Sequence, residues 1–409
     1  MDHVKHLAHA VKEKLNVGSK AAAEEPSGLA TPPSELSEQE RAQKLASWAD
    51  SYSDMVSKTT EQGTSGPGSV HAPVSHDSIP SKHLLWFYGS RTPHDETAEK
   101  YFHFKVYDRE TGQIITERVP LATKLGMEFL FSDLRAVDST TIIKNTLIKE
   151  TIRMGKAYND PASTSHIQGF VNDFNIPLDV LEKPDIKDYR TFNEFFSRKM
   201  RRDVRPIASP GDDTIISSAA DCRLSVFPSI DLAKQYWIKG KHFTLENLFR
   251  DPAMAKRFDG GSLGIFRLAP QDYHRWHVPV GGILSADKKV IPGTFYTVNP
   301  KAVKEHLDVY TENSREVSTL TSPVLGEVAI VAVGAMLVGS IVQTAKPGVP
   351  IARGEEMGYF EFGGSTVLVV FEKGAMKWDE DLVKRSELGM ETLVKLGEKV
   401  GVAEAQKSA

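Results

Sequence analysis

Between residues 207 and 377 the sequence alternates short apolar runs with turn residues. The runs are TIISS, GGSLGIFRLA, GGILSADKKVI, GTFYTV, GEVAIVAVGAMLVGSIV and STVLVVFE, and Pro, Gly, Asp and Asn separate them. Many short strands bounded by such residues are typical of a sandwich or a barrel. The pattern predicts an α+β fold with a β-rich, sandwich-like or barrel-like core over residues 207–409.

The longest apolar run, residues 328–342, is too short for a membrane span, because a spanning helix needs about 20 apolar residues. It is rich in valine and interrupted by Gly334 and Gly339, so we expect a buried strand or a pair of strands. The N-terminus lacks the apolar segment of a secretory signal. Cys222 is the only cysteine, which fits a reducing compartment. We expect an intracellular protein, cytoplasmic or peripheral on endomembranes, without a transmembrane helix.

The residues before this core divide into two parts. Residues 1–83 are rich in Ser, Pro, Gly, Thr, Ala and Glu, a composition that favours disorder. Short amphipathic helices are expected within them, at residues 1–17 and around 38–56. Residues 84–206 mix strands and helices, with a hairpin whose turn is Glu110-Thr111-Gly112. Helical spacing predicts helices at 139–156, 163–174 and 189–200, and again near the C-terminus at 380–400.

One strand-like stretch, FEFGGSTVLVVFEKG (residues 360–374), contains residues that a strand does not need. Gly363 and Gly364 contribute no packing and cost entropy when ordered. Ser365 follows them directly and carries a hydroxyl that becomes a nucleophile when a base removes its proton. The stretch therefore indicates a chemical role, although a simple bulge in a strand is an alternative.

Two other stretches supply partners for a serine nucleophile. SSAADCRLSVF contains Asp221, and APQDYHRWHVPVGG contains Asp272, His274 and His277. Carboxylate, imidazole and hydroxyl form a triad in any chain order, so the order alone decides nothing. Each residue also has a plain structural alternative: a turn for Asp221 and loop or buried positions for the histidines. Two histidines three residues apart also suit a metal, but no third ligand is indicated and we predict no metal.

The glycines suggest which carbonyl Ser365 attacks. The nearest carbonyl in the chain belongs to Gly364, and a side chain there would restrict the backbone distortion that an attack needs. This favours self-cleavage over hydrolysis of an outside substrate. A Ser-His-Asp hydrolase stays an alternative, although the G-x-S-x-G elbow of many such enzymes is absent. A non-catalytic binding domain is another.

The set SAAD, YHRWH and GGST, in this order, resembles the phosphatidylserine decarboxylases. The similarity also includes TFNEFFSRKMRRDVRPI, FPSIDLAKQYWIKGKHFTLENL, GGSLGIFRLAPQDYHRWHVPVGG, IPGTFYTVNP and GEVAIVAVGAMLVGSI. It covers residues 159–401, and more loosely the chain from 83. The Gly-Gly-Ser-Thr form resembles the eukaryotic, non-mitochondrial members, whereas bacterial members tend to have Leu-Gly-Ser-Thr.

The resemblance implies a zymogen that cuts itself between Gly364 and Ser365, into a β chain of residues 1–364 and an α chain of residues 365–409. Asp221 would orient His277, and His277 would take the Ser365 proton. Ser365 would become a pyruvoyl group, the cofactor that forms a Schiff base with the substrate amine. His274 would protonate the product carbanion, with Asp272 in support.

The implied reaction converts phosphatidylserine to phosphatidylethanolamine and carbon dioxide, a step of phospholipid biosynthesis at a membrane surface. The same mechanism on a free amino acid, for example an aromatic one, is the main alternative. Two segments are candidates for membrane contact: residues 1–17, and FFSRKMRRDVR, where Phe195 and Phe196 adjoin five basic residues. Buried phenylalanines beside solvated cations are the other interpretation. Nucleic acid is not expected, because the net charge is −4.

Overall fold

The structure is a computed structural model of the chain. It describes some residues between 43 and 57, and residues 104–117, 139–238, 243–298, 303, 308–335, 340–363 and 365–404. These residues belong to one compact unit, Glu40–Ala409. The predicted disorder of residues 1–83 lies outside the described residues, apart from the helical ones between 43 and 57.

The described helices are mostly short. They are α6 Ser139–Tyr158, η1 Pro161–His166, α7 Ile167–Phe174, η2 Ile186–Asp188, α8 Phe192–Phe196, η3 Arg202–Val204, α9 Ile230–Tyr236, α10 Leu245–Phe249, α11 Pro252–Arg257, α13 Val309–Glu312 and α14 Glu380–Glu387. The strands are β1 Phe104–Asp108, β2 Ile114–Glu117, β3 Ile215–Ser217, β4 Cys222–Phe227, β5 Ser262–Leu268, β6 Arg275–His277, β7 Gly282–Leu284, β8 Lys289–Ile291, β9 Arg315–Ser322, β10 Gly326–Gly334, β11 Ile341–Gln343, β12 Pro350–Ile351, β13 Glu356–Phe360, β14 Ser365–Phe371, β15 Met376–Trp378, β16 Glu391–Val394 and β17 Lys399–Ala403.

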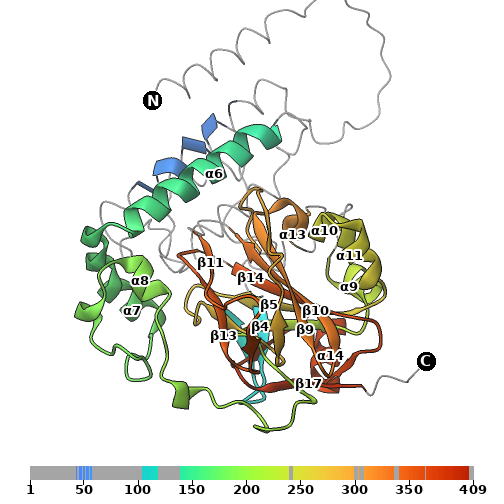
Figure 1. Ribbon diagram of the computed structural model, residues 1–409. Helices are drawn as coiled ribbons and strands as arrows, with labels where there is room; N and C mark the ends of the chain where they lie inside the picture. The colour runs from blue at the N-terminus through green and yellow to red at the C-terminus, as the bar shows by residue number, and fades with distance from the viewer. Residues whose placement is uncertain are drawn as a thin grey trace, which may run out of the picture. The chain divides into compact units, whose positions relative to one another are not determined.

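A large sheet runs through the described part, with the strand order β12-β7-β9-β10-β14-β5-β4-β16-β1-β2 and β8 paired to β9. Its pairs are antiparallel, except that β1 and β16 are parallel. Strands β10, β14, β5 and β4 lie side by side near its middle (Figure 1). Two smaller sheets have the orders β11-β13-β6 and β15-β17-β3. The expected α+β class is confirmed.

Both faces of the central strands are buried. On β14, Leu368 and Val370 pack into a core with residues of α6, α7 and α8, whereas Val367 and Val369 pack into a second core with residues of the small sheets. Alternate residues of a strand point to opposite faces, so a strand covered on both sides is apolar throughout. This explains the unbroken apolar runs of the sequence: the large sheet has helices over one face and strands over the other.

Most of the expected elements are present. The hairpin is confirmed as β1 and β2, the helix at 139–156 is α6, and the run 328–342 contains the two strands β10 and β11. The helix expected at 189–200 is limited to α8, and the one at 163–174 begins as the 3-10 helix η1.

The single helix expected at 380–400 is wrong. Helix α14 ends near Gly389, which has a φ of 71°, a conformation that favours glycine. The chain then forms β16 and β17, whose partners β4, β1 and β3 are distant in sequence. Local spacing contains no information about those partners, so the helical pattern of the segment was misleading.

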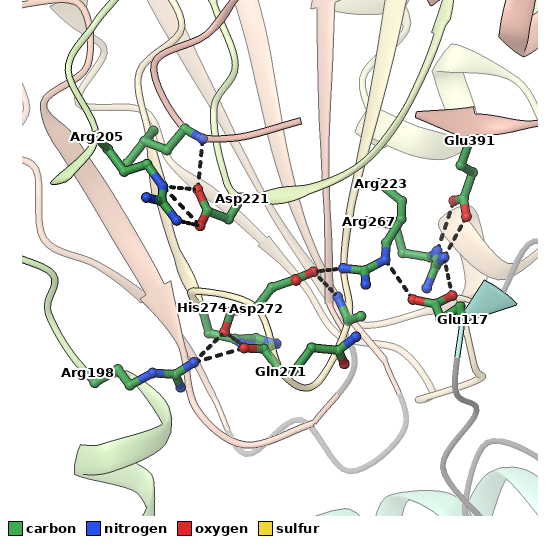
Figure 2. Close-up of polar contacts among 12 residues, drawn as sticks. Glu117, Arg198, Arg205, Asp221, Arg223, Arg267, Gln271, Asp272, His274 and Glu391 are labelled. Atoms are coloured by element: carbon green, nitrogen blue, oxygen red, sulfur yellow. Dashed lines mark hydrogen bonds and ion pairs between the residues drawn. The ribbon is translucent and has the colours of Figure 1, made fainter. Parts of the chain in front are cut away.

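A buried network of charges joins the hairpin to the sheet. Arg267 on β5 pairs with Glu117 of β2 and with Glu391 of β16, and Arg223 on β4 pairs with Glu117 and with Asp272 (Figure 2). Burial opposes ionisation of Glu117, but the two arginines outweigh it and lower its pKa. Residues from both sides of the proposed cut therefore meet in one network.

Arg267→Ala should lower the free energy of unfolding by about 3–5 kcal/mol, because it leaves the buried Glu391 without its cation. Arg190→Ala is the matched control. Arg190 pairs with Glu194 on the surface, so its loss should cost less than about 1 kcal/mol. Denaturant unfolding in a Ser365→Ala background measures both, and equal effects would contradict the importance of the network.

Candidate active site

Ser365 is the first residue of the central strand β14. It pairs with Gly334 of β10 on one side and with Leu268 of β5 on the other. Its side chain is fully buried, and its Oγ makes no hydrogen bond to a described group. A buried hydroxyl without a partner is unusual and costs free energy, so it calls for an explanation. The ladder holds the nucleophile candidate rigidly, and solvent does not reach it.

The residues before Ser365 leave the sheet and pass beside His274. Strand β13 pairs with β6, and the N–H of Phe360 donates to the His274 carbonyl at 2.9 Å. Gly363 follows with a φ of 137°, in the region that only glycine adopts readily. A side chain at position 363 would therefore strain the backbone. Gly364 lies outside the described residues.

His274 is a fully buried histidine next to this segment. Its Nδ1 lies 3.0 Å from the Asp272 carbonyl, and its ring lies 4.0 Å from the ring of Phe196, centroid to centroid. Burial, followed by the charge of Arg198, lowers its pKa to about 3, although the backbone of Asp272 and Gly363 acts the other way. The imidazole is therefore neutral at pH 7.

His277 lies at the other end of β6. Its Nδ1 lies 2.9 Å from the Gly354 carbonyl, and its Nε2 makes no hydrogen bond to a described group. Its pKa is lowered, chiefly by burial. Its main-chain N–H donates to the Ala219 carbonyl, so the loop that carries Asp221 lies against this strand.

Asp221 is engaged by partners that the sequence did not indicate. Its carboxylate accepts two bonds from Arg205 Nε, at 2.9 and 3.1 Å, and one of 2.7 Å from Nη2 (Figure 2). Its Oδ1 also accepts from the N–H of Leu396 at 2.8 Å. The bond raises the pKa of Arg205, which stays charged. No hydrogen bond joins Asp221 to His277 among the described residues, so the orienting role of Asp221 stays a prediction.

Asp272 supports His274 through its main chain rather than its carboxylate. The carboxylate pairs with Arg223 and accepts the N–H of Ala269 at 2.8 Å. Arg198 donates to the carbonyls of Gln271 and Asp272 at 2.9 and 3.1 Å, next to the histidine (Figure 2). Burial lowers the pKa of Arg198 to about 10, so it remains a cation beside His274.

The structure brings some of the predicted residues into contact, and for others it shows no hydrogen bond among the described residues. His274 and Gly363 adjoin, and the Asp221 loop contacts the strand of His277. Ser365 makes no hydrogen bond to either histidine among the described residues. In the sequence, Arg198 and Arg205 stand out only as members of the basic stretch FFSRKMRRDVR. Their spacing did not show that both would turn inward, because the partners lie far along the chain.

Of the two interpretations of FFSRKMRRDVR, the structure supports buried Phe195 and Phe196 beside solvated cations. Both rings are fully buried in the core with α7, so only neighbouring cations such as Lys199, Arg201 and Arg202 face solvent. Within the described ranges, no helix is both long and apolar enough to cross a bilayer. Among the same residues, no group of three or more His, Cys, Asp or Glu side chains is placed to hold a metal ion.

Comparison with known proteins identifies the class. Residues 192–402 match the family described as phosphatidylserine decarboxylase. The phosphatidylserine decarboxylase proenzyme of Clostridium perfringens is 38% identical, over 73% of this chain and 99% of its own length. Proenzyme 3 of Schizosaccharomyces pombe and proenzyme 2 of Oryza sativa subsp. japonica are both 42% identical, over 72% and 74% of this chain. The chain spans 30% of the yeast protein and 49% of the rice protein.

The matched range contains all the candidate residues of the site. The chain therefore belongs to the phosphatidylserine decarboxylase family.

The buried neutral histidine predicts a pH dependence of stability. The pKa of His274 is about 3 in the fold and near 6.5 in an unfolded chain, so the unfolded chain binds the extra proton between these values. The free energy of unfolding should fall as the pH falls below 6.5. From pH 6.5 to pH 5 one such histidine accounts for about 1.5 kcal/mol.

Denaturant unfolding of Ser365→Ala and of Ser365→Ala with His274→Gln measures this loss. The double variant should lose less stability over that range. The same loss in both would show that His274 is not held neutral by the fold.

Proposed function

We propose that this chain is a proenzyme that cuts itself before Ser365 and, once cut, decarboxylates phosphatidylserine. The observation that carries the proposal is the burial of Ser365 on a central strand, behind a two-glycine junction. In the uncut chain an outside substrate cannot reach this fully buried hydroxyl, which argues against a hydrolase; the proposed decarboxylation requires the cut to open a path to residue 365. The Gly364–Ser365 peptide bond, in contrast, adjoins this hydroxyl in the chain. Family membership supports the same conclusion.

The cut follows from ordinary serine chemistry. A base takes the Ser365 proton, and Oγ attacks the Gly364 carbonyl. The peptide bond to the Ser365 nitrogen breaks, and an ester forms between Gly364 and Ser365 Oγ. β-Elimination breaks the ester, leaving a carboxylate on Gly364 and a dehydroalanine at 365. One water then enters and one ammonia leaves, which produces the pyruvoyl group.

His277 is proposed as the base, and Asp221 as the residue that keeps it oriented. The Nε2 of His277 has no described partner. Burial lowers the pKa of His277, so the imidazole is neutral and able to accept a proton at pH 7. Asp221 would have to turn part of its carboxylate from Arg205 toward His277. The loop contact between Ala219 and His277 supports this proximity.

The site fits a pyruvoyl group because Ser365, its source, lies on a fixed strand in a dry environment, two residues after Gly363, which adjoins His274. When present, this group supplies an electrophilic carbonyl that accepts the electrons left by decarboxylation. His274 is proposed to return a proton to the product carbon. Cleavage places a new carboxylate next to Gly363, and a nearby negative charge raises a histidine pKa. The cut would then raise the pKa of His274 and make its protonated form easier to reach.

Wild-type protein should split, under denaturing conditions, into residues 1–364 and 365–409. The small piece should be one ammonia lighter than its serine-started sequence. Ser365→Ala and His277→Ala should stay full length. Intact-mass spectrometry measures all three. Under native conditions the pieces should elute together, because β14, β16 and β17 lie inside the sheets. A wild type that stays uncut would refute the proposal.

Cut enzyme should release carbon dioxide from phosphatidylserine in mixed micelles or vesicles. Free serine and aromatic amino acids should give at least about 10²-fold less product. His274→Ala should still cut itself but lose about 10²–10⁴-fold in turnover, as removal of a general acid does. The assay is release of labelled carbon dioxide, normalised to pyruvoyl content. Equal activity on a free amino acid without lipid would favour the soluble-substrate alternative.

A further inference from the structure

The segment before the proposed cut is held by helical residues that precede the β-rich core. The main-chain N–H of Phe362 donates to Asn193 Oδ1 at 3.0 Å, in a buried position. The Phe362 ring lies edge-on to Tyr158, with centroids 4.6 Å apart, and 5.1 Å from the ring of Phe196. Phe362, only three positions before Ser365, is thus anchored outside the sheet.

Asn193 is held in one orientation. Its Nδ2 donates to Asn159 Oδ1 at 3.1 Å, and the side chain is almost wholly buried. A main-chain N–H can only donate, so the Asn193 oxygen must face Phe362. Helix α8 is itself fixed at its start, because Thr191 Oγ1 accepts the N–H of Glu194 at 3.1 Å.

The residues after the cut have a separate anchor. From Ser365 onward, β14 is bonded to β10 and β5 through its whole length. Only Gly363 and Gly364 connect the two anchors, and Gly363 already has a φ of 137°. The position of the carbonyl relative to Ser365 Oγ therefore depends on both anchors. Attack needs the reacting atoms about 3–3.5 Å apart, so a small displacement of one anchor slows it.

We propose that Asn193 is a positioning residue for self-cleavage: it holds the acyl side of the Gly364–Ser365 bond through the N–H of Phe362. The inference rests on the proposed self-cleavage. It gives the helical region a chemical task, because this region supplies a buried side-chain hydrogen bond to the main chain just before the proposed cut.

Asn193→Leu tests the proposal, since leucine is similar in size but cannot accept a hydrogen bond. The buried N–H of Phe362 would be left without a hydrogen-bond acceptor, and the cut should slow by about 5- to 150-fold. Asn193→Asp keeps an acceptor oxygen, and the exposed Asn159 is able to turn its amide to donate. This variant should cut within about threefold of the wild type. Asn172→Leu, an exposed asparagine on α7, is the matched control and should cut normally.

The measurement is the half-time of cutting after synthesis in a cell-free system, by gel and intact mass. Folding of each variant is checked separately in a Ser365→Ala background by thermal unfolding. Asn193→Ala repeats the test should the leucine variant not fold. Hydroxylamine cleaves esters but not peptide bonds. Treatment of Asn193→Leu with hydroxylamine should therefore release no further fragment, because the substitution slows the attack that forms the ester.

Turnover separates positioning from a general packing defect. Material that Asn193→Leu does cut should decarboxylate at the wild-type rate per pyruvoyl group, whereas a packing defect would lower this rate too. The inference is overturned by a folded Asn193→Leu that cuts as fast as the wild type, or by a folded Asn193→Asp that cuts as slowly as the leucine variant. An uncut wild type would instead refute the proposed function itself.

Discussion

The main-chain ladder of β10, β14 and β5 is the constraint on which the rest of this structure depends. It places Ser365 at the beginning of a strand that has partners on both sides and is covered on both faces. A serine in such a position is unreachable from solvent but next to its own peptide bond. In the proposed function, its chemistry is thereby directed to the chain itself. The same ladder would keep the resulting group in place once the chain is cut.

Charges inside the protein serve two separate purposes. Arg223 and Arg267 are compensated by carboxylates, and together they tie the hairpin, the sheet and β16 into one body. Arg198 instead donates only to main-chain carbonyls in the described residues, and its charge acts on His274. Stability comes from the first arrangement, because broken buried pairs are costly. The second arrangement holds a histidine neutral until its surroundings change.

Helix α8, which precedes the β-rich core, and strand β14 hold residues on opposite sides of the Gly364–Ser365 peptide bond. Asn193 holds Phe362 on the acyl side, and β14 holds Ser365 on the other. Only Gly363 and Gly364 separate these two anchors along the chain. The contact between Asp221 and Leu396 adds a link from the large piece to the small one. Such links explain why the two pieces would stay together after the cut.

The sequence by itself determined the class of fold, the buried central strands, the hairpin and helix α6, and it indicated candidate residues for the site. Those features depend on local composition or on short motifs, such as the two glycines before Ser365. It did not reveal β16 and β17, whose spacing resembles a helix, because their strand partners are distant in the chain. Only the tertiary structure decided that Phe195 and Phe196 are buried, that Arg205 engages Asp221 and that Asn193 reaches Phe362. Each of these depends on which side chains meet across long stretches of sequence, and local patterns contain no record of that.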